Sequence, residues 1–192
     1  MLKPVDKVLV LHCHTTGVNY GDDVTLNQQP LSIALGVFDM KTLKLVDHVN
    51  VMVAFNPEKY NWNDKLVSIH GISKDEALEG EDISDAAAIC AEFIYNNFGT
   101  KEPVPVMGYN PLSFHVPFLQ KVLKTEDLNF KFNQRDVDLY AIGTLANAHT
   151  MKELFETFEI DQTEPLSSLY IIKSFAKIYR YMTTILRESL NV

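Results

Sequence analysis

The sequence predicts a single α/β or α+β domain over residues 1–192, built on a mixed sheet that begins as an antiparallel meander. Two patterns predict this class: β-rich apolar runs fill the start of the chain, and apolar residues at helical spacing fill the rest. The length of 192 residues corresponds to about one domain. With 46% hydrophobic and 22% charged residues, the composition provides a core and excludes disorder, collagen and coiled coil.

Three strands are expected first. Residues 7–14 alternate around an apolar run and stop at a Thr-Thr-Gly turn, which predicts a buried strand. Residues 29–40 and 44–55 have the same character, and the three residues between them, 41–43, form a connection of hairpin length. The start of the sheet is therefore expected to be antiparallel.

Helices are expected from residue 62 onward. Ser73 followed by Glu76 is an N-cap with an acid three residues later, and residues 84–98 carry apolar side chains at helical spacing. A short buried strand is expected at residues 104–107, directly behind Pro103. The remaining helices are expected at residues 112–123, 138–148, 151–158 and 166–190.

The charge balance limits the kinds of partner. The chain carries 17 Lys and Arg against 25 Asp and Glu, a net charge of −8. Proteins that coat long nucleic acid through its phosphates normally present a basic surface, so this role is not expected. An enzyme or binding protein that handles only a strand end remains possible, because a local patch can neutralise a few phosphates.

The sequence also indicates the compartment. Its longest apolar runs, such as residues 33–38, are far shorter than the ~20 residues of a membrane helix, and no leader pattern opens the chain. Cys13 and Cys90 are too few for a disulfide framework, and a reduced thiol is the simpler interpretation. We therefore expect a cytoplasmic protein without a membrane partner.

Four segments carry a resemblance to a known family. They are His-Cys-His-Thr-Thr-Gly at 12–17, Ile-His-Gly-Ile at 69–72, Gly-Tyr-Asn-Pro-Leu-Ser-Phe-His-Val-Pro-Phe-Leu at 108–119 and Val-Asp-Leu-Tyr-Ala at 137–141. In this order and spacing they resemble the DEDD (DnaQ-like) 3′-to-5′ exonucleases, over roughly residues 7–185. The resemblance implies a ribonuclease H-like α/β fold: a mixed sheet of about five strands, the first three antiparallel, with helices on both faces.

The departures from the family pattern fall on its catalytic positions. Where the family has the Asp and Glu of its first motif, this chain has His12 and His14, and His115 replaces the Asp of the second motif. Thr163 and Ser168 align with the His and Asp of the third motif. A two-metal mechanism needs carboxylates to bridge ions about 3.5–4 Å apart, and an imidazole cannot bridge. A standard two-magnesium exonuclease is therefore not expected.

The three histidines are candidates for a rewired metal site. His12 and His14 are two residues apart on a strand and share one face, while Cys13 points to the other. The resemblance implies that His115 converges on that face. Three neutral imidazoles suit one divalent transition metal, zinc first and iron, nickel or manganese as alternatives, which could activate a water molecule. This predicts a metal-dependent nuclease or phosphodiesterase acting on nucleic-acid ends.

Two alternatives stay open. The site could have decayed after losing its function, or the histidines could remove negative charge and accept a phosphate or a partner without any metal. In either case the chain would have no cofactor and would be a catalytically inactive exonuclease-fold domain. Such a domain would bind single-stranded nucleic acid, in particular its 3′ end, or a protein partner.

Further residues match family positions near the substrate, and the resemblance implies nucleic-acid contacts for Thr15, Thr16, Gly17, His70, Asn110 and Phe114. Each also has a structural interpretation. The Thr-Thr-Gly segment would equally end a strand, His70 and Gly71 would equally form a helix C-terminus, and Phe114 would equally belong to the core.

Two groups of charged residues are ambiguous. Asp136 and Asp138 are the acids of the last matching segment, and N-capping of the following helix is the other interpretation. A basic stripe on the final predicted helix could contact a strand end or could be a solvated face; it comprises Lys173, Lys177, Arg180 and Arg187. The aromatic residues of that helix fall on several faces, which indicates packing.

Overall fold

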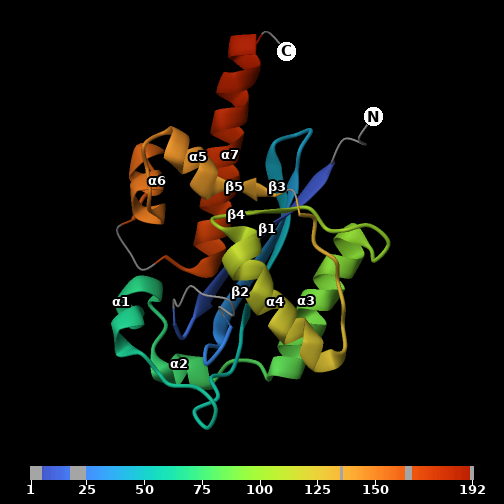
Figure 1. Ribbon diagram of the computed structural model, residues 1–192, viewed down its shortest axis with the longest axis vertical. Coiled ribbons are helices and arrows are strands. Elements are labelled where there is room, and N and C mark those ends of the chain that lie inside the picture. Colours follow the sequence, from blue (N-terminus) through green and yellow to red (C-terminus); the bar gives the residue numbers. More distant parts are fainter. Residues whose placement is uncertain (1–5, 18–24, 135, 163–165, 191–192) are drawn as a thin grey trace.

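The computed structural model describes residues 6–17, 25–134, 136–162 and 166–190 (Figure 1). Five strands form one mixed sheet in the order β3-β2-β1-β4-β5. They are β1 (Lys7–Thr15), β2 (Pro30–Asp39), β3 (Lys44–Met52), β4 (Val106–Gly108) and β5 (Val137–Asp138). The pairs β1–β2 and β2–β3 are antiparallel, whereas β1–β4 and β4–β5 are parallel. The five-stranded sheet with three antiparallel strands at the start is confirmed.

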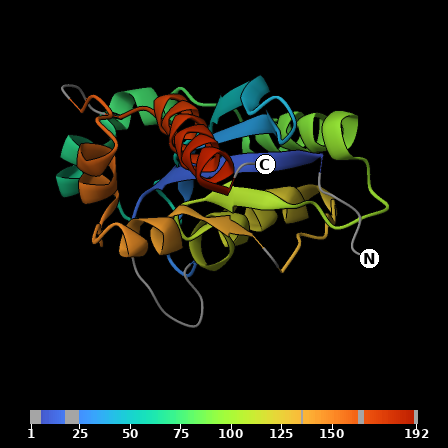
Figure 2. The ribbon, with the colours of Figure 1, turned by 90° about the horizontal axis from the view of Figure 1, so that it is seen from above.

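The helices lie on both sides of this sheet (Figure 2). They are α1 (Val67–His70), α2 (Lys74–Leu78), α3 (Ile83–Phe98), α4 (Val116–Leu123), α5 (Leu139–Leu145), α6 (Met151–Thr157) and α7 (Ser168–Leu190). Helices α3 and α4 pack on one face, and α5, α6 and α7 pack on the other. Helix α7 lies along β1, β2 and β3, and its C-terminal turns project beyond the sheet (Figure 1).

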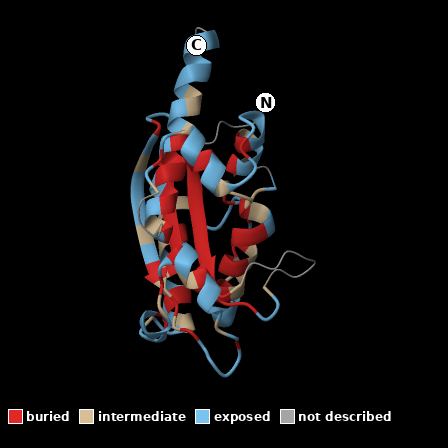
Figure 3. Cartoon of the chain, turned by 90° about the vertical axis from the view of Figure 1, so that its left-hand side faces the viewer, coloured by how far each residue is buried: buried red, intermediate tan, exposed pale blue. Residues whose placement is uncertain are grey.

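Strand β1 is the central strand and separates the two cores. Leu9, Leu11 and Cys13 belong to the core under α3 and α4, while Val8 and Val10 belong to the core under α7. This follows from the two-residue period of a strand, which sends alternate side chains to opposite faces. All of β1 after Lys7 is buried, and the central strands are coloured as buried in Figure 3.

The register leaves the C-terminal part of β1 beyond its parallel neighbour. β1 pairs with β4 at Leu9 and Val10, and the β1–β2 ladder continues to His14 before a bulge at Thr15. On the β4 side, the backbone groups of the last β1 residues therefore face the segment that follows β4. That segment is the π-helical turn Pro111–His115, which leads into α4.

The helix ends follow local chemistry. Ser73 and Glu76 form the predicted capping box of α2, and Thr150 and Glu153 form another at α6. The predicted helix at 112–123 differs, because it opens as a π-turn before α4 begins at Val116. Pro117 explains the difference: it has no N–H for a regular helical bond, so the first turn is wider.

Other boundaries also differ from the sequence predictions. The helix expected at 138–148 spans only Leu139–Leu145, because Asp138 is its N-cap and also closes the two-residue strand β5. The strand expected at 104–107 is β4, shifted to Val106–Gly108, with Val104 in an isolated bridge to Phe132. The strand expected at 44–55 ends at Met52, and the helix expected at 166–190 begins at Ser168.

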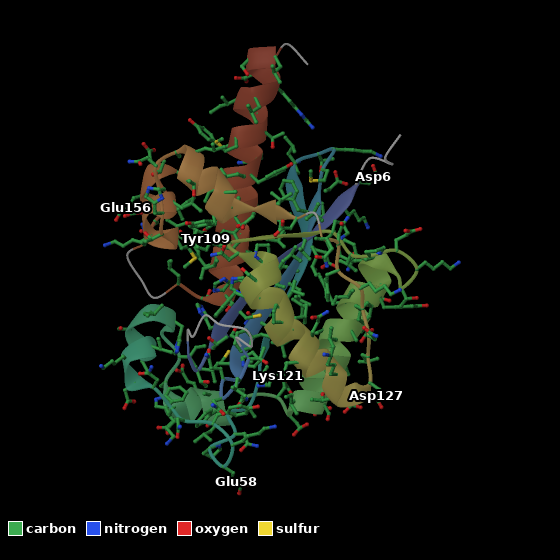
Figure 4. The ribbon with its side chains drawn as sticks, in the orientation of Figure 1. Asp6, Glu58, Tyr109, Lys121, Asp127 and Glu156 are labelled. Carbon is green, nitrogen blue, oxygen red and sulfur yellow. The ribbon has the colours of Figure 1, made fainter. Side chains whose placement is uncertain are left out.

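Three further observations bear on the sequence predictions. Cys13 and Cys90 are free and buried, and burial raises the pKa of both thiols, that of Cys90 to about 12. Lys121 of α4 fixes the segment before β2, since its Nζ donates to the carbonyls of Thr25 and Gln28 at 2.8 and 2.7 Å (Figure 4). In the part of the chain that the structure describes, no helix combines the length and apolar character needed to cross a membrane.

Candidate functional site

A cavity of about 1160 Å³ opens at the C-terminal end of β1. Its walls come from α1, from the π-turn after β4, from the α5–α6 segment and from the start of α7. Five of the six histidines of the chain line it: His12, His14, His70, His115 and His149. This gathering of a scarce residue type marks the cavity as the candidate site.

Four of these rings form a contiguous cluster, which we call the imidazole floor: His12, His14, His70 and His115. The ring centroid of His12 lies 4.8 Å from that of His14 and 4.6 Å from that of His115. The ring of His70 lies 5.6 Å from that of His14. The structure thus brings together the three predicted histidines and adds His70 from α1. All four residues are at most 7% exposed.

Hydrogen bonds to the backbone fix the tautomers of three rings. The N–H of Cys13 donates to Nδ1 of His115 at 3.1 Å, and the N–H of Ile72 donates to Nδ1 of His70 at 3.0 Å. A ring nitrogen that accepts a proton bond carries a lone pair, so the neutral rings of His115 and His70 are protonated on Nε2. The ring of His14 is also protonated on Nε2, because its Nε2 lies 2.8 Å from the carbonyl of Leu166 and must donate.

Several polar atoms of the site lack a partner. Both ring nitrogens of His12, Nε2 of His70 and the hydroxyl of Ser168 are buried without a hydrogen bond to any described residue. An orphaned buried polar group typically costs about 1–3 kcal/mol. The floor therefore presents unused donors and acceptors, as expected of a surface that receives a polar ligand.

The floor is electrically neutral near pH 7. Burial lowers the pKa of His14 to about 4 and that of His115 to about 3, and it holds the pKa of His12 well below the ordinary value. Mutual repulsion among the imidazoles adds to the shift of His12. Burial also lowers the pKa of His70. Protonating any of these rings would place a charge on a largely buried side chain that water solvates poorly.

The cavity wall carries no acidic side chain among the described lining residues, although the whole chain has a net charge of −8. Lys152 is the one Lys or Arg in that described lining. Asp138 lies outside the cavity lining and serves as a cap, since its Oδ1 accepts from the N–H groups of Asn110 and Tyr140. Burial raises the pKa of Asp136, which is likewise outside the described lining.

The residues do not fit the two metal ions that the resemblance implies, because the described lining supplies no carboxylate to bridge them. A single transition metal would need three imidazole lone pairs. His14 offers Nδ1 and His12 offers one nitrogen, but the Nδ1 lone pair of His115 is already used by Cys13. Within the described ranges, no group of three His, Cys, Asp or Glu residues is arranged to hold a metal.

The predicted nucleic-acid-binding residues divide into two sets. Lining the cavity are Thr15, His70, Asn110 and Phe114, whereas Thr16 and Gly17 are not among its described lining residues. The hydroxyl of Thr15 donates to the carbonyl of Gly17, and that of Thr16 accepts from the N–H of Gln29 at 3.0 Å. The Thr-Thr-Gly segment thus has the bonding of a strand-ending turn.

His70 and Phe114 combine a structural and a lining role. Gly71 ends α1 in the left-handed conformation with φ of 72°, which matches the helix C-terminus foreseen as an alternative. Phe114 packs against Phe118 within the core, with the ring centroids 5.2 Å apart, and it also borders the cavity. Both roles hold at once, because these residues lie where the core meets the cavity.

The third-motif positions and the basic stripe contribute differently. Ser168 is the first residue of α7 and is buried, while Thr163 lies outside the described residues. The four basic residues of α7 are exposed and do not belong to the described lining of the main cavity. Lys177 and Arg180 border a separate cavity of about 310 Å³ beside the end of α6. Among the aromatic residues of α7, Phe175 is fully buried and contacts His12, whereas Tyr170 and Tyr181 are 37% and 58% exposed, so packing was predicted correctly for only part of this set.

The sequence did not identify a second part of the cavity wall. Tyr109, Tyr140, His149 and Lys152 line the cavity from the end of β4 and from α5, α6 and the segment between them. Tyr109 lies next to the α5–α6 segment (Figure 4), and its hydroxyl donates to the carbonyl of His149 at 3.0 Å. Spacing along the chain gave no signal for this wall, because tertiary packing alone brings residues 40 positions apart into contact.

Comparison with solved structures places this arrangement in a known fold. The nuclease domain of 3′hExo, a DEDDh family member bound to rAMP, matches with a TM-score of 0.70 at 15% identity, covering 94% of this chain and 92% of that one. The chain has the fold of the DEDDh 3′-exonucleases. E. coli Exonuclease I in complex with an oligonucleotide matches with a TM-score of 0.77 at 13% identity.

The two comparisons differ in extent. The match covers 97% of this chain but 43% of the Exonuclease I chain, so this chain spans less than half of that protein. A zinc-bound form of the E. coli ExoI–ssDNA complex matches with a TM-score of 0.70 at 15% identity, over 96% of this chain and 42% of that one. No protein-family model and no curated protein sequence matches the chain.

Proposed function

We propose that this chain is an exonuclease-fold domain that binds the 3′ end of single-stranded nucleic acid in the cavity, without metal-dependent cleavage. One observation carries the proposal. At the positions where the resemblance implies carboxylates, the structure has neutral imidazoles, both nitrogens of His12 are unpartnered among the described residues, and the described lining contains no acid. The site is thus suited to a phosphate-bearing ligand and poorly suited to bridging metal ions.

Electrostatics support this proposal. A cluster of ionised carboxylates repels a phosphate unless bound cations offset the charge, at about 4 kcal/mol per pair at 4 Å and an effective dielectric constant of 20. Neutral imidazoles remove this repulsion. The Nε2–H group of His70 remains as a donor, since its Nδ1 accepts the N–H of Ile72 and its Nε2 has no partner among the described residues.

The comparisons support the ligand class. The similar structures of 3′hExo and Exonuclease I were determined with rAMP and with oligonucleotides. The cavity volume of about 1160 Å³ exceeds the upper end of the ~300–1,000 Å³ range of small-ligand pockets, so a nucleotide fits it. The low charge of the wall also fits an end-binding protein better than one that coats long strands.

The proposal is tested by binding and cleavage assays on the same protein. After EDTA treatment, fluorescence anisotropy should show binding of a 5′-labelled linear single strand and no comparable binding of a circular strand. His70→Leu should weaken binding at least tenfold, because it removes an unpartnered donor. His48→Leu, on the exposed side of β3, is the matched control and should bind as the wild type.

Two results would contradict the proposal. One is progressive shortening of the 3′ end when Mg²⁺, Mn²⁺ or Zn²⁺ is supplied. The other is the failure of the chelated protein to bind any linear strand.

The second candidate function is a metal-dependent nuclease that uses His12, His14 and His115. A specific observation favours it: the ring of His12, with both nitrogens unpartnered, lies within 5 Å of the other two rings. The zinc-bound form of the similar ExoI complex is consistent with zinc as the metal. This function requires the Cys13–His115 hydrogen bond to open, so that Nδ1 of His115 is released.

Elemental analysis separates the two candidates. A metal enzyme should be purified with near-stoichiometric Zn, Fe, Ni or Mn, and the double variant His12→Ala, His14→Ala should lose that metal. If the purified protein contains no metal and a chelator leaves its melting temperature unchanged, the second candidate function is wrong.

A further inference from the structure

The part of the cavity wall that Tyr109 and Tyr140 form has an aromatic surface. Tyr109 follows β4, and Tyr140 lies in the first turn of α5. Their rings contact each other edge to face, with the centroids 5.6 Å apart and an interplanar angle of 82°. Both line the cavity. Tyr140 is 38% exposed, so part of its ring remains available to a ligand after the contact with Tyr109.

This aromatic wall is held in place by hydrogen bonds. Oδ1 of Asp138 accepts from the N–H of Tyr140 and from the N–H of Asn110, each at 2.9 Å. The hydroxyl of Tyr109 donates to the carbonyl of His149 at 3.0 Å. The two tyrosines therefore have a fixed relative position before a ligand binds, which lowers the entropy lost on binding.

The wall also carries a cationic side chain. Lys152 borders the cavity, and its ion pair with Glu156 is long, at 3.8 Å, and solvent-exposed. Such exposed pairs contribute little energy, so Lys152 can turn toward a phosphate at small cost. Glu156 is not part of the described lining.

We propose that the cavity holds at least two nucleotides of the strand, one on the imidazole floor and the next with its base stacked on Tyr140. This inference rests on the proposed function and names its ligand more closely: a single strand of two or more nucleotides, rather than a free mononucleotide. Tyr140 supplies the stacking face, Tyr109 and Asp138 position it, and Lys152 neutralises the phosphate between the two nucleotides. Stacking on an aromatic side chain tolerates any base, so little sequence preference is expected.

A comparison of ligand lengths tests the inference. With EDTA present, the affinity of the full chain is measured for a mononucleotide and for single strands of two, three and six nucleotides. Wild-type affinity should rise sharply from one nucleotide to two. Tyr140→Ala should weaken strand binding about 5- to 150-fold, which is the range for loss of one stacked base, and leave mononucleotide binding within twofold.

Control variants separate stacking from folding. Tyr140→Phe keeps the ring and should bind strands as the wild type does. Tyr95→Ala removes an aromatic residue of α3 that is 60% exposed and outside the described cavity lining, and it should have no effect. Circular dichroism and melting temperature establish that Tyr140→Ala is folded.

The outcomes distinguish this inference from the proposed function. Equal affinity of the wild type for one and two nucleotides, or equal strand affinity of Tyr140→Ala and wild type, would overturn the inference and leave end binding intact. If the wild type binds neither mononucleotide nor strand, the proposed function fails, and the inference fails with it.

Discussion

The two faces of β1 bury side chains for different reasons. On the face toward α3 and α4, Leu9, Leu11 and Cys13 pack into a continuous hydrophobic core. On the face toward α7, the same strand begins with Val8 and Val10 but ends with His12 and His14. Both faces are almost fully buried, yet only the second contains ring nitrogens without a partner among the described residues.

The difference shows where stability and function are separated in this molecule. Apolar burial stabilises the fold in proportion to the area removed from water. Burial of an unpartnered imidazole lowers the stability of the fold, because the hydrogen bonds of the ring to water are lost without replacement. The α3–α4 face of β1 therefore stabilises the fold along its whole length. The α7 face does so at Val8 and Val10, but the buried imidazoles at its cavity end lower the stability.

The largest effect is expected on the hydrophobic face. Leu11 is fully buried, so Leu11→Ala should lower the free energy of unfolding by about 2–5 kcal/mol through lost burial and the cavity left behind. Urea denaturation measures the change. Val46→Ala, at a site that is 55% exposed, is the control and should stay within about 0.5 kcal/mol of the wild type. A loss below about 1 kcal/mol for Leu11→Ala would remove the contrast between the faces.

A smaller effect is expected on acidification. The pKa of His14 falls from 6.5 in the unfolded chain to about 4 in the folded protein, so the unfolded state binds its proton at a higher pH. The contribution of His14 to the free energy of unfolding is fully present above about pH 6.5. It is lost as the pH falls toward 4, and the loss is on the order of 3 kcal/mol. Urea midpoints at pH 7 and pH 4.5 measure it.

The matched variant for this pH effect is His14→Gln. Its amide still offers a donor to the carbonyl of Leu166 but does not titrate in this range. The variant should therefore lose distinctly less stability than the wild type between pH 7 and pH 4.5. Identical losses would show that His14 does not contribute to the acid sensitivity of this face.

The smallest effect has the opposite sign. His12→Leu replaces an imidazole whose two nitrogens are unpartnered among the described residues with an apolar side chain, and should raise the free energy of unfolding by about 1 kcal/mol. The same variant should bind a single strand with an affinity at least tenfold lower than that of the wild type. A destabilisation of His12→Leu in urea would show that His12 supports the fold and would weaken the comparison between the faces.

Much of the fold could be predicted because its signals are local. Alternation placed β1 and β2 to within one residue and the start of β3 correctly, and the Ser73–Glu76 pair placed the start of α2. The short strand β5 could not be located, since two residues carry no periodicity and Asp138 equally indicates a helix start. The π-turn before α4 also escaped prediction, because it depends on how Pro117 is accommodated.

For the candidate site, the prediction was partial for a similar reason. The i, i+2 spacing of His12 and His14, together with a family resemblance, was enough to name three rings, and the structure brings the ring of His12 within 5 Å of the other two. His70 entered the sequence analysis only as a nucleic-acid contact, and its position beside His14 depends on how α1 packs. Tyr140 and His149 gave no signal, because no local rule relates them to β1.

By itself, the sequence determined the three antiparallel strands of the sheet, the two-faced character of β1 and the placement of His12 and His14 on one face at its end. Those features follow from residue type and from the two-residue period of a strand. The tertiary structure alone decided which ring nitrogens carry protons, because the N–H of Cys13 and the carbonyl of Leu166 reach the rings from distant parts of the chain. Hydrogen bonds across more than 100 residues depend on how the helices pack, and they set what the cavity can bind.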